Sequence, residues 1–262
     1  MFYEKYVKVT KEKSSIININ LDPALPTQRK EYVIPDRFIS KEDQETLLNF
    51  SLDIIEQVSD YCCCIKPNTQ YFLGHTNILK KITEKTHKEG MLAILDHKLS
   101  DIGSTNASAI YWIKEMGFDA FTFSPFAGNI KETVEKAQKQ NLGVIVLTLM
   151  SNPEAKELML DTKVDETSYY LHTSKTVKVT GADGCVVGLT GFIQDSYIRN
   201  IQEAAGENAI LLLQGLGPQG GDQSKVKYVR NPLISLGRKV IYASNPKKVV
   251  KEYYETLNKF RR

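Results

Sequence analysis

The stretch Leu92-Ala93-Ile94-Leu95-Asp96-His97-Lys98-Leu99-Ser100-Asp101-Ile102-Gly103-Ser104-Thr105 passes abruptly from apolar residues to a cluster of charges. Its first part, Leu92–Asp96, is short and apolar, as expected of a strand buried in a parallel sheet. Where the chain leaves this strand in an extended conformation, Asp96 and Lys98 point to the same side and can pair. The stretch therefore predicts a buried strand that ends in a pair of opposite charges.

The charged part of this stretch also has a simpler interpretation. An isolated Asp-x-Lys-x-x-Asp pattern, here Asp96, Lys98 and Asp101, is more often a surface salt bridge beside a helix N-cap, which Ser104 or Thr105 would provide. Its position directly after a strongly hydrophobic strand favours a functional site instead. A second lysine at a strand end, in Ile65-Lys66-Pro67-Asn68, supports that choice, because it would project toward the same place.

The same order of a short apolar run, a polar stretch and a helix-period segment recurs along the whole chain. We predict eight strands, at Ile16–Leu21, Cys62–Lys66, Leu92–Asp96, Ala120–Ser124, Val144–Thr148, Gly184–Gly188, Ile210–Leu213 and Leu233–Leu236. Helical periodicity is present at Lys41–Val58, His75–Lys88, Thr105–Met116, Ile130–Gln140, Asp165–Lys178, Asp195–Ala205 and Pro246–Phe260, and the segment before the last strand is short. Such alternation is typical of repeated βα units, in either a barrel or an open doubly wound sheet.

Polar side chains at the strand ends separate these two folds. They are Asp22, Lys66, Asp96 with Lys98, Ser151, Gln219 and Arg238. A barrel brings the carboxyl ends of all its strands to one mouth, whereas an open sheet does not. We therefore predict an α/β fold in which residues 1–262 form a single (β/α)8 barrel of eight parallel strands, with the active site at their carboxyl ends.

Length and composition agree with this fold and limit the partners. The chain has 262 residues, 42% of them hydrophobic, which matches one α/β barrel. Its 34 basic and 31 acidic residues give a net charge of +3, so we expect neither a nucleic-acid nor a membrane partner. Cys62, Cys63, Cys64 and Cys185 lie in apolar runs without a metal-binding spacing, and no window approaches a membrane span, so we expect a cytoplasmic protein.

A glycine-rich loop, Leu213-Gln214-Gly215-Leu216-Gly217-Pro218-Gln219-Gly220-Gly221-Asp222, follows the seventh predicted strand, and Gly237-Arg238 follows the eighth. Phosphate sites of (β/α)8 barrels often use the loops after these two strands. Glycines let backbone N–H groups approach phosphate oxygens, and Arg238 can add a charge-assisted contact. A glycine-rich loop alone is usually a flexible turn, but together with Arg238 it predicts a phosphorylated substrate.

Together these motifs resemble the orotidine 5′-phosphate decarboxylase family along nearly the whole chain. The matching segments are Asn20-Leu21-Asp22-Pro23, Lys66-Pro67-Asn68 with Phe72, Asp96–Thr105, Ser151-Asn152-Pro153-Glu154-Ala155, Gly184–Gly188, Gly215–Asp222 and Gly237-Arg238. The Asp-x-Lys-x-x-Asp-Ile-Gly-x-Thr run joined to the Gln-Gly-Gly-Asp loop is the most specific of them. One position departs from the family: Gln214 stands where the family typically has proline.

The resemblance implies an enzyme that converts orotidine 5′-phosphate to uridine 5′-phosphate and CO2 in de novo pyrimidine biosynthesis, without a metal or an organic cofactor. It implies an alternating catalytic array of Lys66, Asp96, Lys98 and Asp101, in which Lys98 donates the proton to C6 of the pyrimidine. It also implies a homodimer with shared active sites, because Asp101, Ile102 and Thr105 would reach into the site of the partner subunit.

The resemblance also assigns the substrate contacts. Ser151 would contact the pyrimidine, and Gln219 and Arg238, with Gly237 beside them, would bind the phosphate. Asp22 and Lys66 would contact the ribose hydroxyls, together with Thr105 of the partner subunit.

Two other functions are compatible with these residues. A sugar-phosphate decarboxylase or aldolase of the same barrel group shares the Asp-x-Lys-x-x-Asp frame but uses a divalent metal. The Ile-Gly-Ser-Thr continuation and the Gln-Gly-Gly-Asp loop favour the pyrimidine substrate over it. A nucleotide-binding protein without catalysis would need the phosphate loop, but it would have no use for a cluster of partly buried charges at Lys66, Asp96, Lys98 and Asp101.

Overall fold

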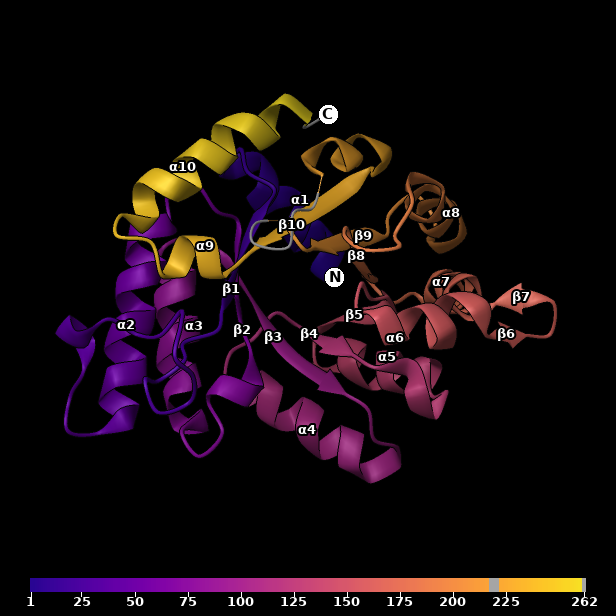
Figure 1. Cartoon of the computed structure of the whole chain (residues 1–262). Coiled ribbons are helices and arrows are strands. Elements are labelled where there is room, and N and C mark those ends of the chain that lie inside the picture. Colours follow the sequence, from indigo (N-terminus) through magenta and orange to yellow (C-terminus); the bar gives the residue numbers. More distant parts are fainter. Residues whose placement is uncertain (217–221, 261–262) are drawn as a thin grey trace.

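The computed structural model describes residues 1–216 and 222–260, and its centre is a closed barrel of eight parallel strands (Figure 1). The strands are β1 (Ile17–Leu21), β2 (Cys64–Pro67), β3 (Leu92–Leu99), β4 (Ala120–Phe123), β5 (Gly143–Leu149), β8 (Gly184–Gly188), β9 (Ile210–Gln214) and β10 (Asn231–Leu236). Each strand pairs with the next barrel strand along the chain, and β10 pairs with β1 to close the ring. The predicted (β/α)8 barrel is confirmed, and the open sheet is wrong.

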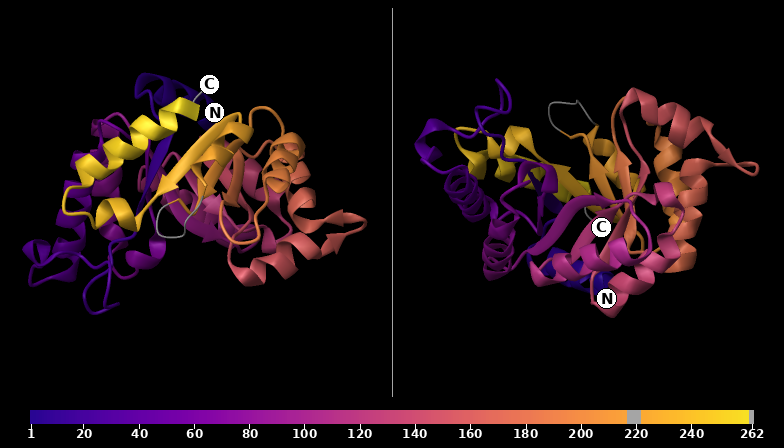
Figure 2. Two further views of the ribbon diagram at one scale, coloured as in Figure 1. Left: turned by 45° about the horizontal axis from the view of Figure 1, so that its top comes forward. Right: turned by 90° about the horizontal axis from the view of Figure 1, so that it is seen from below.

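Helices surround the barrel (Figure 2). The long ones after the strands are α2 (Asp43–Val58), α3 (Leu79–Lys88), α4 (Gly103–Glu115), α5 (Ile130–Lys139), α7 (Tyr169–Thr180), α8 (Asp195–Ala205) and α10 (Pro246–Leu257). Shorter helical pieces are α6 (Pro153–Ala155), α9 (Arg238–Ile241), a π-helical turn at Lys156–Asp161, and 3-10 turns at Asp36–Phe38, Thr69–Tyr71, Thr76–Ile78, Pro125–Ala127, Gln223–Tyr228 and Asn258–Phe260. Each predicted helical segment overlaps one of the long helices, and the short 3-10 turn at Gln223–Tyr228 precedes the last strand as predicted.

One predicted helix begins later than its sequence periodicity indicates. The segment Asp165–Lys178 was expected to be helical, but α7 begins at Tyr169. The residues before it form an antiparallel hairpin of β6 (Lys163–Val164) and β7 (Thr167–Ser168), which projects away from the barrel (Figure 2). Asp165 lies in the turn with a φ of 51°, a left-handed conformation that a helix does not contain.

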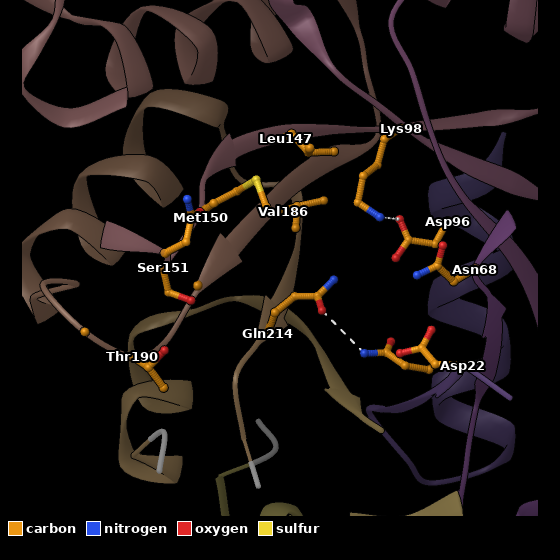
Figure 3. A pocket seen from close by; sticks show the side chains of 14 residues that line it. Asp22, Asn68, Asp96, Lys98, Leu147, Met150, Ser151, Val186, Thr190 and Gln214 are labelled. Carbon is orange, nitrogen blue, oxygen red and sulfur yellow. Dashed lines mark hydrogen bonds and ion pairs between the residues drawn. The ribbon is translucent and has the colours of Figure 1, made fainter. Parts of the chain in front are cut away.

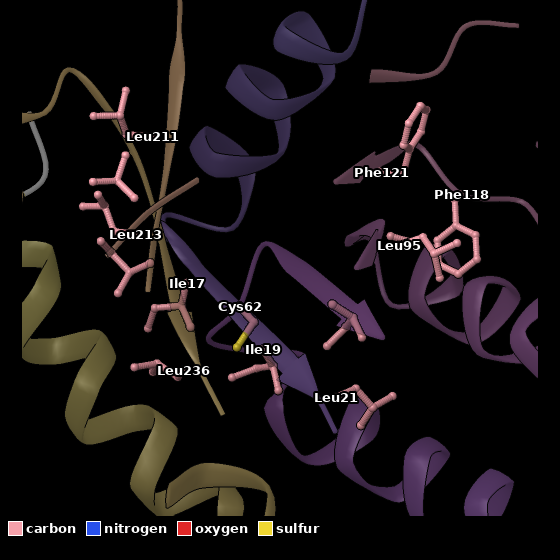
Figure 4. Close-up of a cluster of buried hydrophobic side chains, with 14 of the residues drawn as sticks. Ile17, Ile19, Leu21, Cys62, Leu95, Phe118, Phe121, Leu211, Leu213 and Leu236 are labelled. Atoms are coloured by element: carbon pink, nitrogen blue, oxygen red, sulfur yellow. The ribbon is translucent and has the colours of Figure 1, made fainter. Parts of the chain in front are cut away.

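Alternation along the strands divides the apolar residues into two layers. Outward-facing residues such as Ile17, Ile19 and Leu21 pack beneath the helices (Figure 4). Inward-facing residues near the amino ends of the strands, such as Leu92 and Ile94 of β3, form a second cluster inside the barrel. Toward the carboxyl ends the inward positions of several strands become polar, and the next one on β3 is Asp96. The barrel is therefore apolar at one end and partly polar at the other.

A helix that the sequence analysis did not predict covers the apolar end. α1 (Phe2–Glu12) inserts Phe2 and Tyr6 into the cluster inside the barrel, and the Tyr6 hydroxyl donates a hydrogen bond of 2.9 Å to the carbonyl oxygen of Pro232. A side chain at Gly143 would not fit, since its Cβ would lie 2.5 Å from the Phe2 ring. No helix in the described residues is both long and apolar enough to cross a membrane.

Candidate active site

A cavity of about 650 Å³ lies at the carboxyl ends of the strands, on the polar side of the barrel (Figure 3). Asp22, Asp96, Lys98 and Ser151, all predicted site residues, line it. Leu147, Met150 and Val186 provide an apolar wall opposite the charged groups. A half-charged, half-apolar cavity of this size suits a small molecule that carries both a flat apolar body and polar substituents.

Asp96 lies between two lysines at the inner edge of this cavity. Its Oδ2 forms an ion pair with the Lys66 ammonium group, and its Oδ1 lies 2.7 Å from Lys98 Nζ. The Thr122 hydroxyl donates a further hydrogen bond of 2.9 Å to Oδ1. Lys66 and Asp96 are buried, with 1% and 8% of their side chains exposed, so the surface salt-bridge interpretation is wrong for this cluster.

The neighbouring lysines determine the charge state of Asp96. Burial by itself would raise the pKa of this carboxyl, but the positive charges of Lys66 and Lys98 and the hydrogen bonds that they donate outweigh burial and hold the pKa well below its usual range. Asp96 is therefore a carboxylate at neutral pH. Lys66, Asp96 and Lys98 together carry a formal charge of +1.

Lys98 reaches this position through an irregular backbone. The predicted pairing with Asp96 is confirmed, but the predicted extended backbone is wrong, because Lys98 has a φ of 53° and the register of β3 against β4 shifts between Leu95 and Leu99. The Lys98 N–H donates to the Thr122 hydroxyl, 3.0 Å away. A left-handed residue that is not glycine costs about 1–3 kcal/mol, and such residues cluster at functional sites.

Asp22 is a second carboxyl group on the same cavity. Burial raises its pKa, and the positive charge of Lys66 offsets only part of that effect. Its Oδ1 atom is buried and has no hydrogen-bond partner among the described residues. The Tyr242 hydroxyl holds the backbone here by donating a hydrogen bond of 2.7 Å to the Asp22 carbonyl oxygen. Asp22 thus offers an acceptor that a ligand hydroxyl can satisfy.

A smaller cavity of about 160 Å³ adjoins the first and contains the predicted phosphate residues Gly237 and Arg238. The guanidinium of Arg238 lies 5.4 Å from the ring centre of Tyr32. Arg29 holds that tyrosine through a hydrogen bond of 2.9 Å from its Nε to the Tyr32 carbonyl oxygen. Gln219, the other predicted phosphate residue, lies outside the described residues.

Ser151 reaches the main cavity because the facing strand has no side chain there. A Cβ atom on Gly188 would lie 2.6 Å from the Cβ of Ser151, so only glycine at the end of β8 permits this approach. The predicted contact of Ser151 with the pyrimidine remains a prediction, and its position on the cavity wall is compatible with it.

Asp101, Ile102 and Thr105 do not line the cavity of their own chain, and all three are exposed. The Asp101 carboxylate accepts a hydrogen bond of 2.8 Å from the N–H of Ile102, and its carbonyl oxygen accepts one of 3.0 Å from Asn129. Helix α4 begins at Gly103 with Ile102 at the N-cap position, so neither Ser104 nor Thr105 is the N-cap. Within one chain, Asp101 is separate from the pair formed by Lys66 and Asp96.

Several polar residues in or directly behind the site were not predicted to have a role there. Asn18 and Asn20 share the inward face of β1 with Asp22, and the alternating order Ile17-Asn18-Ile19-Asn20-Leu21 was a signal for this placement. Thr122 is the one polar residue of β4. A polar residue at an inward position of an apolar strand therefore marks the rim of the site. No three His, Cys, Asp or Glu side chains gather as metal ligands in the described ranges.

Comparisons with known proteins agree with this geometry. The model of the orotidine 5′-phosphate decarboxylase / HUMPS family matches residues 43–253. The orotidine 5′-phosphate decarboxylase of Thermomicrobium roseum is 30% identical over 259 residues, covering 92% of this chain and 87% of the relative. That of Flavobacterium johnsoniae is 32% identical over 248 residues, covering 89% and 86%. The Leishmania donovani OMP decarboxylase structure, 20% identical, has the same fold with a TM-score of 0.80 and covers 98% of both chains.

Proposed function

This chain belongs to the orotidine 5′-phosphate decarboxylase / HUMPS family, and from that premise we propose that it is a carbon–carbon lyase of pyrimidine biosynthesis. It converts orotidine 5′-phosphate to uridine 5′-phosphate and CO2. The observation that carries this proposal is the carboxylate of Asp96 between Lys66 and Lys98 on the wall of the cavity. A binding protein gains nothing from so costly a buried arrangement of charges.

The two adjoining cavities suggest how the nucleotide lies. Arg238 in the smaller cavity binds the phosphate, and Gly215 and Leu216, which line the same cavity, contribute backbone N–H groups. The pyrimidine lies in the larger cavity, against Ser151 and the apolar wall, with its reacting edge toward Lys98. Asp22 lines both cavities, so the ribose between base and phosphate has a buried carboxylate oxygen for one of its hydroxyl groups.

The charges then act on the bond that breaks. Cleavage of the bond between C6 and its carboxylate releases CO2 and leaves an electron pair on C6, next to no group that could take it up. Lys98 stabilises that developing charge and transfers a proton from Nζ to C6, and the neutral amine regains a proton from water. Asp96, ionised beforehand, disfavours the substrate carboxylate beside it and keeps Lys98 in place.

The active form in this proposal is a homodimer. Asp101, Ile102 and Thr105 project from the rim of the barrel and would complete the site of a second subunit. The exposure of this segment supports the dimer, since 59% of Ile102 at the N-cap of α4 is accessible to solvent, and so are 50% of Tyr111 and 60% of Trp112 on the helix, whose rings lie 5.2 Å apart. Exposed large apolar side chains often mark an interface.

We further propose that one barrel domain spans the chain and that the protein works in the cytoplasm. The likeness to the Leishmania donovani structure, which covers 98% of both chains, supports one domain. All four cysteines are buried free thiols, as is usual for a reducing compartment.

The proposal is tested by following the ultraviolet absorbance of orotidine 5′-phosphate incubated with the purified protein. Loss of the substrate signal with formation of uridine 5′-phosphate supports it, whereas tight binding without consumption would indicate a nucleotide-binding protein. The same assay with EDTA separates the metal-dependent alternative. We expect full activity in EDTA, and a sugar-phosphate substrate consumed only without EDTA would overturn the assignment.

A further inference from the structure

Gln214 is the last residue of β9, and it lines both the cavity of Lys98 and the cavity of Arg238. Only Asn20 and Asp22 share this property among the described residues that line the two cavities. In the register of β8 and β9 the neighbour of Gln214 is Gly188, which leaves room for its side chain to extend into the opening. Gln214 therefore stands at the junction of the two cavities.

A chain of amide groups fixes which end of the Gln214 side chain faces the junction. Asn18 Nδ2 donates to Asn20 Oδ1 over 3.0 Å, which leaves Asn20 Nδ2 as the donor toward its other neighbour, Gln214 Oε1, at 3.4 Å. Ser235 anchors the other end of the chain, since its hydroxyl lies 3.0 Å from Asn18 Nδ2. The oxygen of Gln214 is therefore used within the protein.

The nitrogen of Gln214 is turned the other way, toward the open space (Figure 3). It donates no hydrogen bond to any of the described residues. A primary amide carries two donors, and one that is held at a cavity wall with its donors unused is prepared to bind an acceptor atom of a ligand. The neighbouring Asp22 has the opposite chemistry, because its buried Oδ1 lacks a donor.

We propose that Gln214 is a substrate-specificity residue, whose Nε2 donates to a neutral acceptor oxygen of the nucleoside where the sugar joins the pyrimidine. This inference rests on the proposed function. With the base at Lys98 and the phosphate at Arg238, the sugar and its bond to the base must lie at the junction, which only Asn20, Asp22 and Gln214 share. Gln214 offers the donor and Asp22 the acceptor, a complementary pair for an oxygen acceptor beside a hydroxyl.

The chemistry of position 214 makes the inference specific to this chain. The family typically has proline here, which has no side-chain donor, whereas Gln214 brings an amide that Asn20 already orients. Such a neutral donor stabilises binding of a ligand that has an acceptor at the right position, but it does not attract anions in general. It therefore tunes selection of the nucleoside, and it leaves attraction of the phosphate to Arg238.

The first test replaces Gln214 by alanine and by glutamate. Glutamate has nearly the same shape but no donor, so both variants should lose roughly tenfold in kcat/KM for orotidine 5′-phosphate and in affinity for uridine 5′-phosphate. Most of the loss should appear in KM rather than kcat, because the contact is distant from C6. The matched control is the same pair of changes at Gln140, which is exposed at the end of α5, and these should have no effect.

A second test reverses the orientation of the Gln214 side-chain amide without substituting Gln214 itself. In Asn20→Asp the side chain at position 20 can only accept, so the Gln214 amide turns its nitrogen toward it and presents its oxygen to the ligand. Asn20→Asp should therefore weaken uridine 5′-phosphate binding as much as Gln214→Glu does. If Asn20→Asp binds the nucleotide as the wild type does, the orientation proposed for Gln214 is wrong.

A third measurement separates nucleoside from phosphate. On orotidine, which lacks the phosphate, Gln214→Ala should lose the same factor in kcat/KM as on the full nucleotide, and added inorganic phosphite should activate variant and wild type by equal factors. Loss of phosphite activation would place Gln214 at the phosphate and overturn the inference. So would unchanged kcat/KM of both Gln214 variants while the wild type is active. A wild type that does not consume the nucleotide would instead refute the proposed function, and the inference with it.

Discussion

Lys98 and Asp96 show how the roles of single residues depend on the backbone that carries them. Lys98 has a left-handed conformation at the point where β3 slips against β4, and this irregularity directs its side chain to Asp96. A lysine in a regular strand would have an extended backbone without this strain. Because the surrounding strands maintain the strain, the ammonium group is held in place before a substrate arrives, which is what electrostatic catalysis requires.

Lys98→Ala should reduce turnover of orotidine 5′-phosphate by about a thousandfold or more, because it removes the proton donor and the charge that stabilises C6. Affinity for uridine 5′-phosphate should change little, since the phosphate contact is elsewhere. Absorbance kinetics and calorimetric titration measure the two quantities. A variant that keeps turnover within tenfold of the wild type would disprove the role of Lys98.

Arg238→Ala should weaken binding of uridine 5′-phosphate by roughly 10- to 100-fold, the usual effect of losing a charge-assisted contact. It should also slow the bound complex modestly, because part of the phosphate binding energy is expressed in the transition state. With orotidine as substrate, inorganic phosphite should activate the wild type more than this variant. Equal activation of both would show that Arg238 does not hold the phosphate.

At the scale of elements, the barrel strands were predictable because each is a short apolar run followed by a polar rim. Alternation along each strand predicted that Asp22, Lys66 and Asp96 face the inside of the barrel. Because the carboxyl ends of the strands converge, these side chains were then predicted to meet at one site. What could not be predicted is local geometry: the slip of β3 at Lys98 depends on pairing with β4, a contact between segments distant in sequence. The orientation of Gln214 likewise depends on Asn20, which lies on β1 at the other end of the chain.

Helix α1 was not predicted because it is stabilised by contacts with parts of the chain that are distant in sequence. Phe2, Tyr6 and Val9 are apolar at a helical spacing, but lysines and glutamates alternate with them, and the segment precedes the first strand of the βα pattern, so it was not recognised. Only the empty apolar end of the barrel, with Gly143 beneath the Phe2 ring, explains why it folds there. Asp183 ties its start to the barrel, accepting from the N–H groups of Tyr3 at 3.2 Å and Val144 at 2.9 Å.

This anchor has a pH dependence whose sign can be worked out. Burial raises the pKa of Asp183 to about 6, although the hydrogen bonds from Val144 and Tyr3 lower it in part. The folded protein therefore binds more protons than the unfolded chain between about pH 4 and pH 6, so the contribution of Asp183 to stability falls as the pH rises through this window. The fall is at most about 3 kcal/mol.

The measurement compares wild type with Asp183→Asn, in which this group cannot titrate. From pH 4 to pH 7 the free energy of unfolding, obtained from urea titrations, should decrease in the wild type relative to the variant. Comparing the two proteins cancels the other carboxyl groups, including Asp96 and Asp119, whose lowered pKa values act in the opposite sense at lower pH. A difference that is constant with pH would contradict a raised pKa at Asp183.

At the scale of the whole molecule, one chain leaves the proposed array incomplete. Lys66, Asp96 and Lys98 meet inside their own barrel, but Asp101 follows only three residues after Lys98, where the chain already leaves β3 for α4. Its backbone is held there by Asn129, and its carboxylate faces the N–H of Ile102 rather than the cavity. For the Asp101 side chain to enter the cavity of its own subunit, these contacts would have to break. A second subunit could contact Asp101 in its present position.

Mixing two inactive proteins, Lys98→Ala and Asp101→Ala, should therefore restore activity. In a two-fold symmetric dimer that shares its sites, a mixed dimer has one site with both lesions and one site with neither. With free exchange and equal amounts, about half of the dimers are mixed, so about a quarter of all sites are intact and activity should approach that fraction of the wild type. Native mass spectrometry establishes whether mixed dimers have formed. If they have formed and the mixture stays inactive, Asp101 serves its own subunit, and the partner's Asp101 has no part in the site.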